Sequence, residues 1–133
     1  MSPQDTNHPG TGSSAEVVDE IIRARRTSMA VDPARSVSVG LISELCNLAS
    51  WAPCHKRTWP WKFAYVTGAA RQRFGDAVAD SMANNGDDSA LVLKRRSKYL
   101  RTPGVLVVGS VSGDTPTRTQ ENRDATAAAI QNL

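Results

Sequence analysis

The strongest constraint on the fold of this 133-residue chain is an apolar run, Val105-Leu106-Val107-Val108-Gly109-Ser110-Val111, which follows a Pro103-Gly104 turn. A continuous run of this kind is typical of a buried strand. A second buried strand is predicted over 62–67, where aromatic and β-branched residues precede Gly68. The other segments with regular hydrophobic spacing have helical patterns, so the chain has to place two apolar strands among helices.

The first helical segment begins at Ser13-Ser14-Ala15-Glu16, which has the pattern of a capping box, and we expect it to end near Arg26. The residues before it, 1–14, are rich in Pro, Gly, Asn, Ser and Thr and have no apolar periodicity. They are predicted to be a disordered tail, in which His8 is a solvated side chain. Further helices are predicted over 41–49, 69–82, 89–100 and 119–133.

Length and composition favour a single compact domain over 15–133, because 40% of the residues are hydrophobic. The net charge of +3 is mild and does not call for a nucleic-acid partner. Cys46 and Cys54 have neither a disulfide nor a metal-ligand spacing, and no apolar run is long enough for a membrane span. We therefore expect a cytoplasmic protein that binds no metal and no membrane.

The most unusual segment is Ala52-Pro53-Cys54-His55-Lys56-Arg57-Thr58-Trp59-Pro60-Trp61-Lys62-Phe63, which lies between a predicted helix and a predicted strand. It holds two prolines and two tryptophans among cations. Tryptophan in a connecting loop wastes apolar area unless the loop contacts something, so this composition favours a ligand-facing loop.

This loop, paired with the upstream Arg25-Arg26-Thr27 turn, resembles the FMN-dependent nitroreductase family, closest to its small, minimal branch. The resemblance covers an Arg-Arg-Ser/Thr turn and an Ala-Pro-x-His-x-x-x-x-Pro-Trp-x-Phe loop. It implies an α+β fold with a central β-sheet covered by helices, and a homodimer with two shared flavin sites. It also implies FMN as cofactor, NADH or NADPH as hydride donor, and a nitroaromatic, quinone or similar small molecule as electron acceptor.

The resemblance also implies which residues bind the cofactor. Arg25 and Arg26 would bond the FMN phosphate with their guanidinium forks, while Thr27 adds a hydroxyl. His55 would contact the flavin across the dimer interface. Two simpler interpretations stay open: arginines at a helix end also bond free backbone carbonyls, and a loop histidine can do the same. No side chain is expected to act as acid, base or nucleophile.

The sequence departs from the family pattern at three positions. Cys54 replaces an Asp or Ser, and a thiol donates so weakly that the polar contacts of this position are expected to be lost. Trp51 and Met29 stand where relatives can carry cations, which would weaken the phosphate site. In the same loop, Pro60 and Trp61 are interpreted as structural residues, and Trp59 as a structural residue that could also line the pocket rim.

A second group of cations, on the segment 89–100 and just after it, has a simpler interpretation. These residues would spread around more than half of a helix, which is typical of a solvated face, and only one aromatic is available to stack on a base. The group comprises Lys94, Arg95, Arg96, Lys98 and Arg101.

The final helical pattern, over 119–133, stops while it is still apolar and without a C-capping signal. Residues 121–133 resemble the central helix of the family, which continues into further strands and helices. We therefore expect a chain truncated at its C-terminus, matching the N-terminal two-thirds of a nitroreductase. The alternative function is that of a truncated, non-catalytic relative acting as an interaction module.

Overall fold

A computed structural model describes residues 13–133, so most of the predicted tail, with His8, lies outside the described residues. The described part is α+β, as predicted, with five α-helices, two short 3-10 turns and two strands. Internal contacts divide the chain into two compact units, 1–30 and 31–133, which are described separately.

The first unit contains α1, Ser14–Ala24. Its capping box is confirmed, since the Glu16 N–H donates to Ser13 Oγ at 3.3 Å and the Ser13 N–H donates to the Glu16 carboxylate at 2.5 Å. The helix ends two residues earlier than Arg26, at Ala24, and no residue of α1 is buried within this unit.

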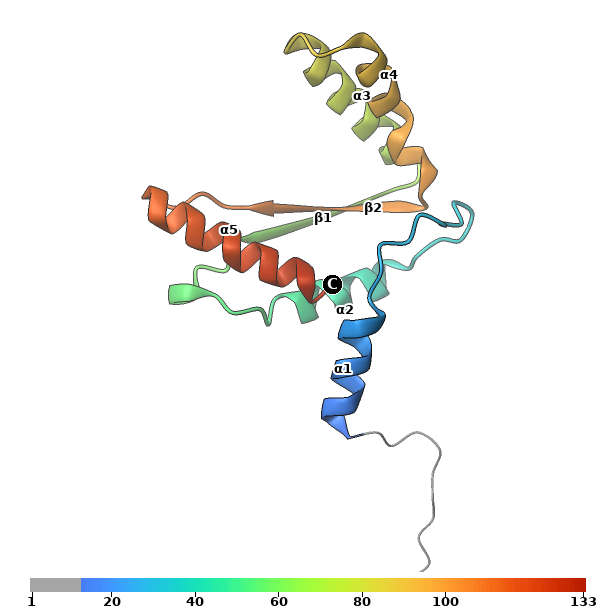
Figure 1. Ribbon diagram of the computed structural model, residues 1–133. Coiled ribbons are helices and arrows are strands. Elements are labelled where there is room, and N and C mark those ends of the chain that lie inside the picture. Colours follow the sequence, from blue (N-terminus) through green and yellow to red (C-terminus); the bar gives the residue numbers. More distant parts are fainter. Residues whose placement is uncertain (1–12) are drawn as a thin grey trace, which may run out of the picture. The chain divides into compact units, whose positions relative to one another are not determined.

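The second unit is built on an antiparallel pair of strands, β1 (Trp61–Thr67) and β2 (Gly104–Ser110). Trp61 pairs with Ser110 and Tyr65 with Leu106, and both strands begin one residue before their predicted starts. Because the strands are antiparallel, the end of β1 lies beside the start of β2. The segment 68–103 therefore leaves and re-enters the sheet at one end, while the 54–60 loop lies at the other end (Figure 1).

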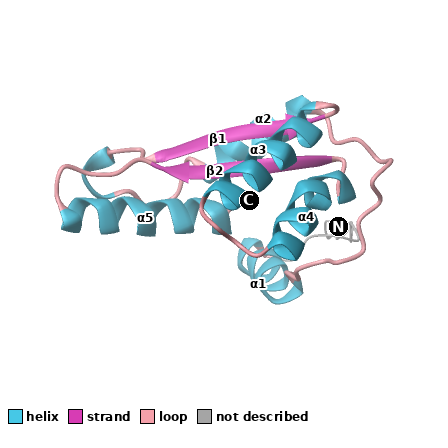
Figure 2. Cartoon of the chain, turned by 90° about the horizontal axis from the view of Figure 1, so that it is seen from above, coloured by secondary structure: helices cyan, strands magenta, loops and turns pink. Residues whose placement is uncertain are grey.

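The core of this unit lies where α2 (Val39–Ala49) and α5 (Pro116–Gln131) pack against β1. Small side chains dominate it, and they let the two helices approach closely. Figure 2 shows α5 running along the strand pair. The buried cluster comprises Ala49, Ala52, Trp61, Ala125 and Ala129, with Cys54, Phe63 and Ala128 packed against it.

The segment between the strands forms a helical hairpin of α3 (Ala70–Asn84) and α4 (Ser89–Lys98), followed by the 3-10 turn η2, Tyr99–Arg101. The rings of Phe74 and Tyr99 meet edge to face, with centroids 4.8 Å apart. No helix in residues 13–133 combines the length and apolar character needed to cross a membrane.

The cation group on α4 and η2 remains in contact with solvent, and its members lie in two environments. Arg96 turns toward α3 and forms ion pairs with Asp76 at 3.0 Å and Asp80 at 2.6 Å. The remaining members line a surface hollow of about 310 Å³, together with Leu91 and Ser97; they are Lys94, Arg95, Lys98 and Arg101.

Candidate functional site

The predicted ligand-facing loop has an unusual backbone. After Cys54 the chain forms a 3-10 turn, η1 (His55–Arg57), and enters the left-handed region at three residues that are not glycine. Lys56, Arg57 and Trp59 have φ angles of 55°, 53° and 40°. Such conformations are sparsely populated by L-residues, so the surrounding structure has to hold them in place.

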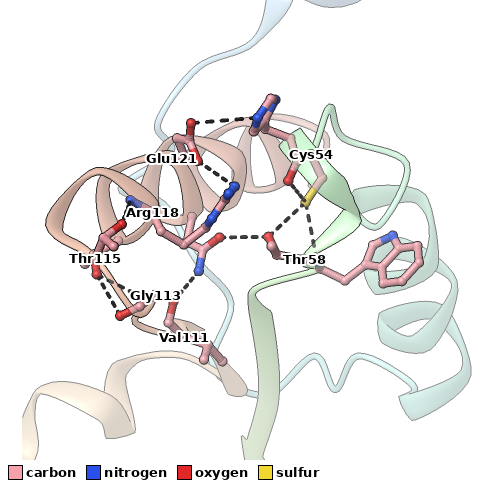
Figure 3. A network of polar contacts seen from close by, with 11 residues as sticks. Cys54, Thr58, Val111, Gly113, Thr115, Arg118 and Glu121 are labelled. Carbon is pink, nitrogen blue, oxygen red and sulfur yellow. Dashed lines mark hydrogen bonds and ion pairs between the residues drawn. The ribbon is translucent and has the colours of Figure 1, made fainter.

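A buried asparagine on α5 supplies part of that support. Thr58 Oγ1 donates to Asn122 Oδ1 at 2.7 Å, and Asn122 Nδ2 donates to the Val111 carbonyl at 2.9 Å. Asn122 is only 4% exposed, and both ends of its amide are satisfied. The side chain therefore joins the loop to the segment that follows β2, and dashed lines mark its two hydrogen bonds, one ending at Thr58 and the other at Val111 (Figure 3).

Cys54 takes part in the same network, contrary to the expectation that a thiol at this position loses its polar contacts. Its Sγ accepts the Trp59 N–H at 3.3 Å and lies 3.4 Å from Thr58 Oγ1. The loop folds back so that a backbone donor five residues further along reaches the sulfur. The contact therefore relies on the sulfur as an acceptor.

His55 is exposed, and its ring faces a carboxylate on α5. His55 Nε2 lies 4.0 Å from Glu121 Oε1, and the other oxygen of Glu121 accepts from Arg118 at 2.6 Å. Glu121 is thus shared between a permanent cation and a histidine that attracts it when protonated. No described contact joins the His55 ring to a backbone carbonyl, which was the simpler interpretation of this residue.

A hollow of about 540 Å³ lies between the loop and α5, within the range of small-molecule sites. One wall is apolar and comes from α5 alanines, while carboxylates and an imidazole supply its polar groups. The lining consists of Pro53, Cys54, His55, Glu121, Asp124, Ala125 and Ala128.

Arg25, Arg26 and Thr27 follow α1 in the first unit, and all three are exposed there. The Arg26 guanidinium donates to the carbonyls of Arg23 at 2.5 Å and Arg25 at 2.8 Å, as the helix-end interpretation expects. Within residues 13–133 the Arg25 side chain has no ion pair or hydrogen bond. These three predicted site residues are consecutive in the first unit, whereas the fourth, His55, belongs to the second unit.

The tryptophans of the loop region have different environments. Trp61 is 8% exposed and Pro60 is fully buried, which confirms their structural role. Trp59 is 59% exposed, so it does not anchor the loop in this unit, and it does not line the hollow. Trp51 is exposed as well. In the part of the chain that is described, no group of three His, Cys, Asp or Glu residues is placed to hold a metal ion.

The sequence interpretation missed Asn122, Glu121 and Arg118 because it treated the last helix as an alanine-rich packing surface. A signal was nevertheless present. Asn122 falls on the same helical stripe as Ala125 and Ala129, at spacings of three and seven, and a polar residue on a buried stripe needs hydrogen-bond partners.

Comparison with known proteins identifies the family. The sequence profile of the Nitroreductase family matches residues 22–133, which includes both the Arg25–Thr27 turn and the 52–63 loop. This chain belongs to the Nitroreductase family.

Individual relatives agree with this assignment. The Bacillus subtilis (strain 168) protein with the name "Putative NAD(P)H nitroreductase YfhC" is 31% identical over 121 residues, covering 88% of this chain and 61% of YfhC. A nitroreductase-like family protein from Bacillus cereus has a TM-score of 0.69 at 29% identity, covering 86% of this chain and 60% of that one. The FMN-dependent nitroreductase NfnB from Mycobacterium smegmatis, solved with NADPH, shares the fold at a TM-score of 0.65 and 20% identity, covering 89% of this chain and 69% of NfnB.

The chain spans about three-fifths of the length of YfhC, and less of the other curated relatives that it matches.

Proposed function

We propose that this chain forms part of an FMN-dependent NAD(P)H oxidoreductase, which passes electrons to a nitroaromatic, quinone or similar small acceptor in the cytoplasm. The observation that carries the proposal is that the family match, over residues 22–133, includes both predicted site segments. NfnB is named as FMN-dependent and was solved with NADPH, and a Bacteroides fragilis nitroreductase of the same fold was solved with bound FMN. These names support the choice of cofactor and donor.

In this proposal the flavin, when bound, supplies the chemistry of accepting and releasing hydride. Arg25 and Arg26 bind its phosphate dianion, and Thr27 adds a hydroxyl donor. For Arg26 this requires exchanging its two backbone carbonyl contacts for phosphate oxygens, which make stronger, charge-assisted hydrogen bonds. The functional unit is a homodimer in which His55 of one copy contacts the flavin held by the other.

The second candidate function is that of a non-catalytic interaction module. It is favoured by the Arg26 contacts, since a guanidinium already bonded to its own helix end has less reason to bind phosphate. The two functions differ in a property that is simple to measure, which is flavin binding.

The test begins with the visible absorbance of the purified chain and a titration with FMN, followed by flavin fluorescence. Reductase activity is then assayed with excess FMN, NADH or NADPH, and a quinone acceptor. The same assays are run on a chimera that appends the part of YfhC beyond its match to this chain.

We expect weak FMN binding and little turnover by the 133 residues alone, and much more by the chimera. The chimera is expected to make several charge-assisted hydrogen bonds to FMN that the 133 residues alone lack. At roughly 1.5–3 kcal/mol each, these bonds correspond to orders of magnitude in FMN affinity. Equal turnover would show that the 133 residues already hold a complete site. Absence of FMN binding in both proteins would favour the interaction module.

A further inference from the structure

We propose that Asn122 is a positioning residue, which acts through Thr58 to hold His55 at the hollow between the 54–59 loop and α5. The proposal rests on the proposed function, because the purpose of that position is contact with the flavin. Three observations carry it: the positive φ angles of the loop, the burial of Asn122, and the position of Glu121 next to Asn122 on α5.

The loop needs external support because its own backbone disfavours the observed shape. Lys56, Arg57 and Trp59 all have positive φ angles, and none of them is glycine. No regular secondary structure extends through all three residues, because η1 ends at Arg57 and leaves Trp59 outside it. A loop like this keeps one conformation only where tertiary contacts over-determine it.

Asn122 provides such a contact from a rigid element. It sits in the middle of α5, where Arg118 and Ala125 lie one turn away on either side, and its side chain is almost fully buried. One amide hydrogen bond fixes Thr58 in the loop, and the other fixes the Val111 carbonyl. The backbone N–H of Val111 in turn donates to the Pro60 carbonyl at 2.8 Å. The loop is thereby tied to the helix and to the strand end together.

The same helix also carries the residue that faces His55. Glu121 precedes Asn122, accepts from Arg118 at 2.6 Å and lies 4.0 Å from the imidazole. Because Glu121 and Asn122 share one rigid backbone, the position of the loop and the position of the carboxylate beside its histidine are set together. A loosened Thr58 contact would let His55 move away from this arrangement while α5 stays folded.

Thr126 offers a matched control for a purely structural hydrogen bond. Its hydroxyl donates to the Asn122 carbonyl at 2.8 Å, it is 5% exposed, and it lies on the same helix. Thr58→Val and Thr126→Val each remove one threonine hydroxyl while keeping a β-branched side chain of similar size. Thr58→Ser keeps the hydroxyl and tests rescue.

The experiment measures two quantities for the wild type and the three variants. The first is the rate of trypsin cleavage after Lys56 and Arg57 without FMN, identified by mass spectrometry, because a protease needs an extended segment and the native loop is left-handed there. The second is the dissociation constant for FMN, measured by flavin fluorescence. It is measured on the 133-residue chain if that chain binds flavin, and otherwise on the chimera.

We expect Thr58→Val to raise cleavage in the loop several-fold and to weaken FMN binding about tenfold, as for the loss of one hydrogen bond. Thr58→Ser and Thr126→Val should stay near the wild type in both quantities. Equal effects of Thr58→Val and Thr126→Val on both would overturn the proposal, and so would faster cleavage with unchanged FMN affinity. If no wild-type form binds FMN, the proposed function fails separately, and equal cleavage of the two valine variants still overturns the positioning role.

Discussion

The backbone of Arg96 packs so closely on Gly75 that a side chain at position 75 would overlap the Arg96 carbonyl oxygen. Gly75 is buried in the interior of α3, where glycine is normally unfavourable, and Arg96 lies on α4. The close packing of α3 on α4 therefore requires glycine at position 75, whereas the helical structure of α3 alone does not.

Gly75→Ala should destabilise the protein even though alanine is the better helix former. Relief of the overlap requires the two helices to separate, at a cost of about 1–3 kcal/mol, which exceeds the gain of up to about 1 kcal/mol in helix propensity. Urea unfolding measures the difference. Gly40→Ala in α2 is the control, because a Cβ there meets only Ser38 Oγ at 3.9 Å, and we expect it to stabilise the protein slightly.

Arg96→Gln should lower stability by the same amount at pH 7 and at pH 9. The hydrogen bonds that the Arg96 guanidinium donates to Asp80, and then to Asp76, raise the pKa of Arg96 above its ordinary value. A raised pKa means that the stabilisation is complete below the ordinary arginine pKa and is lost only as the pH rises past the raised one, which lies above this range.

The measurement is the urea midpoint of the wild type and the variant at both pH values. Lys94→Gln serves as control, since Lys94 has no ion pair within residues 13–133 and should change stability little at either pH. An effect of Arg96→Gln that fades between pH 7 and pH 9 would contradict the prediction.

Replacing Arg25 and Arg26 together with alanine should abolish measurable FMN retention, because guanidinium forks at a loop grip a phosphate. The matched control is Lys94→Ala with Lys98→Ala, which removes the same charge from the hollow on α4. Equilibrium titration with FMN compares the two double variants. Unchanged affinity in the first and lost affinity in the second would move the phosphate site to α4.

The protein should self-associate, and substitution of Ile21 and Ile22 by Gln should weaken the association. Within the first unit the apolar face of α1 is uncovered, and these two residues are each 64% exposed. Ile130 and Leu133 at the end of α5 add further exposed apolar surface. Light scattering over a range of concentrations measures the mass, with Glu20→Gln on α1 as control. A strictly monomeric wild type at high concentration would refute this prediction.

Most of the secondary structure could be predicted because its signals are local. The capping box at Ser13 and Glu16 and the apolar run of β2 depend on residues only a few positions apart. The boundaries shifted by one to three residues, as where α5 begins at Pro116 under a Thr115 cap, a signal that the hydrophobic pattern alone did not include. The family could also be recognised from the sequence, because its two motifs are short and continuous.

The candidate site could be predicted only in part. The position of the loop and of His55 followed from composition and motif, whereas the partners Glu121 and Asn122 come from α5, more than sixty residues along the chain. The acceptor role of Cys54 was missed because it depends on the loop folding back to bring the Trp59 N–H to the sulfur.

The sequence by itself therefore determined which segments are helices and strands, where the first helix is capped and which family the chain belongs to, because each rests on neighbouring residues. Only the tertiary structure decided the antiparallel pairing of β1 with β2, the turning of Arg96 toward Asp76 and Asp80, and the bridge from Asn122 to Thr58. The physical reason is that these contacts join segments distant in sequence. Their geometry is set by how alanines, glycines and strands pack against one another, and no local pattern encodes that packing.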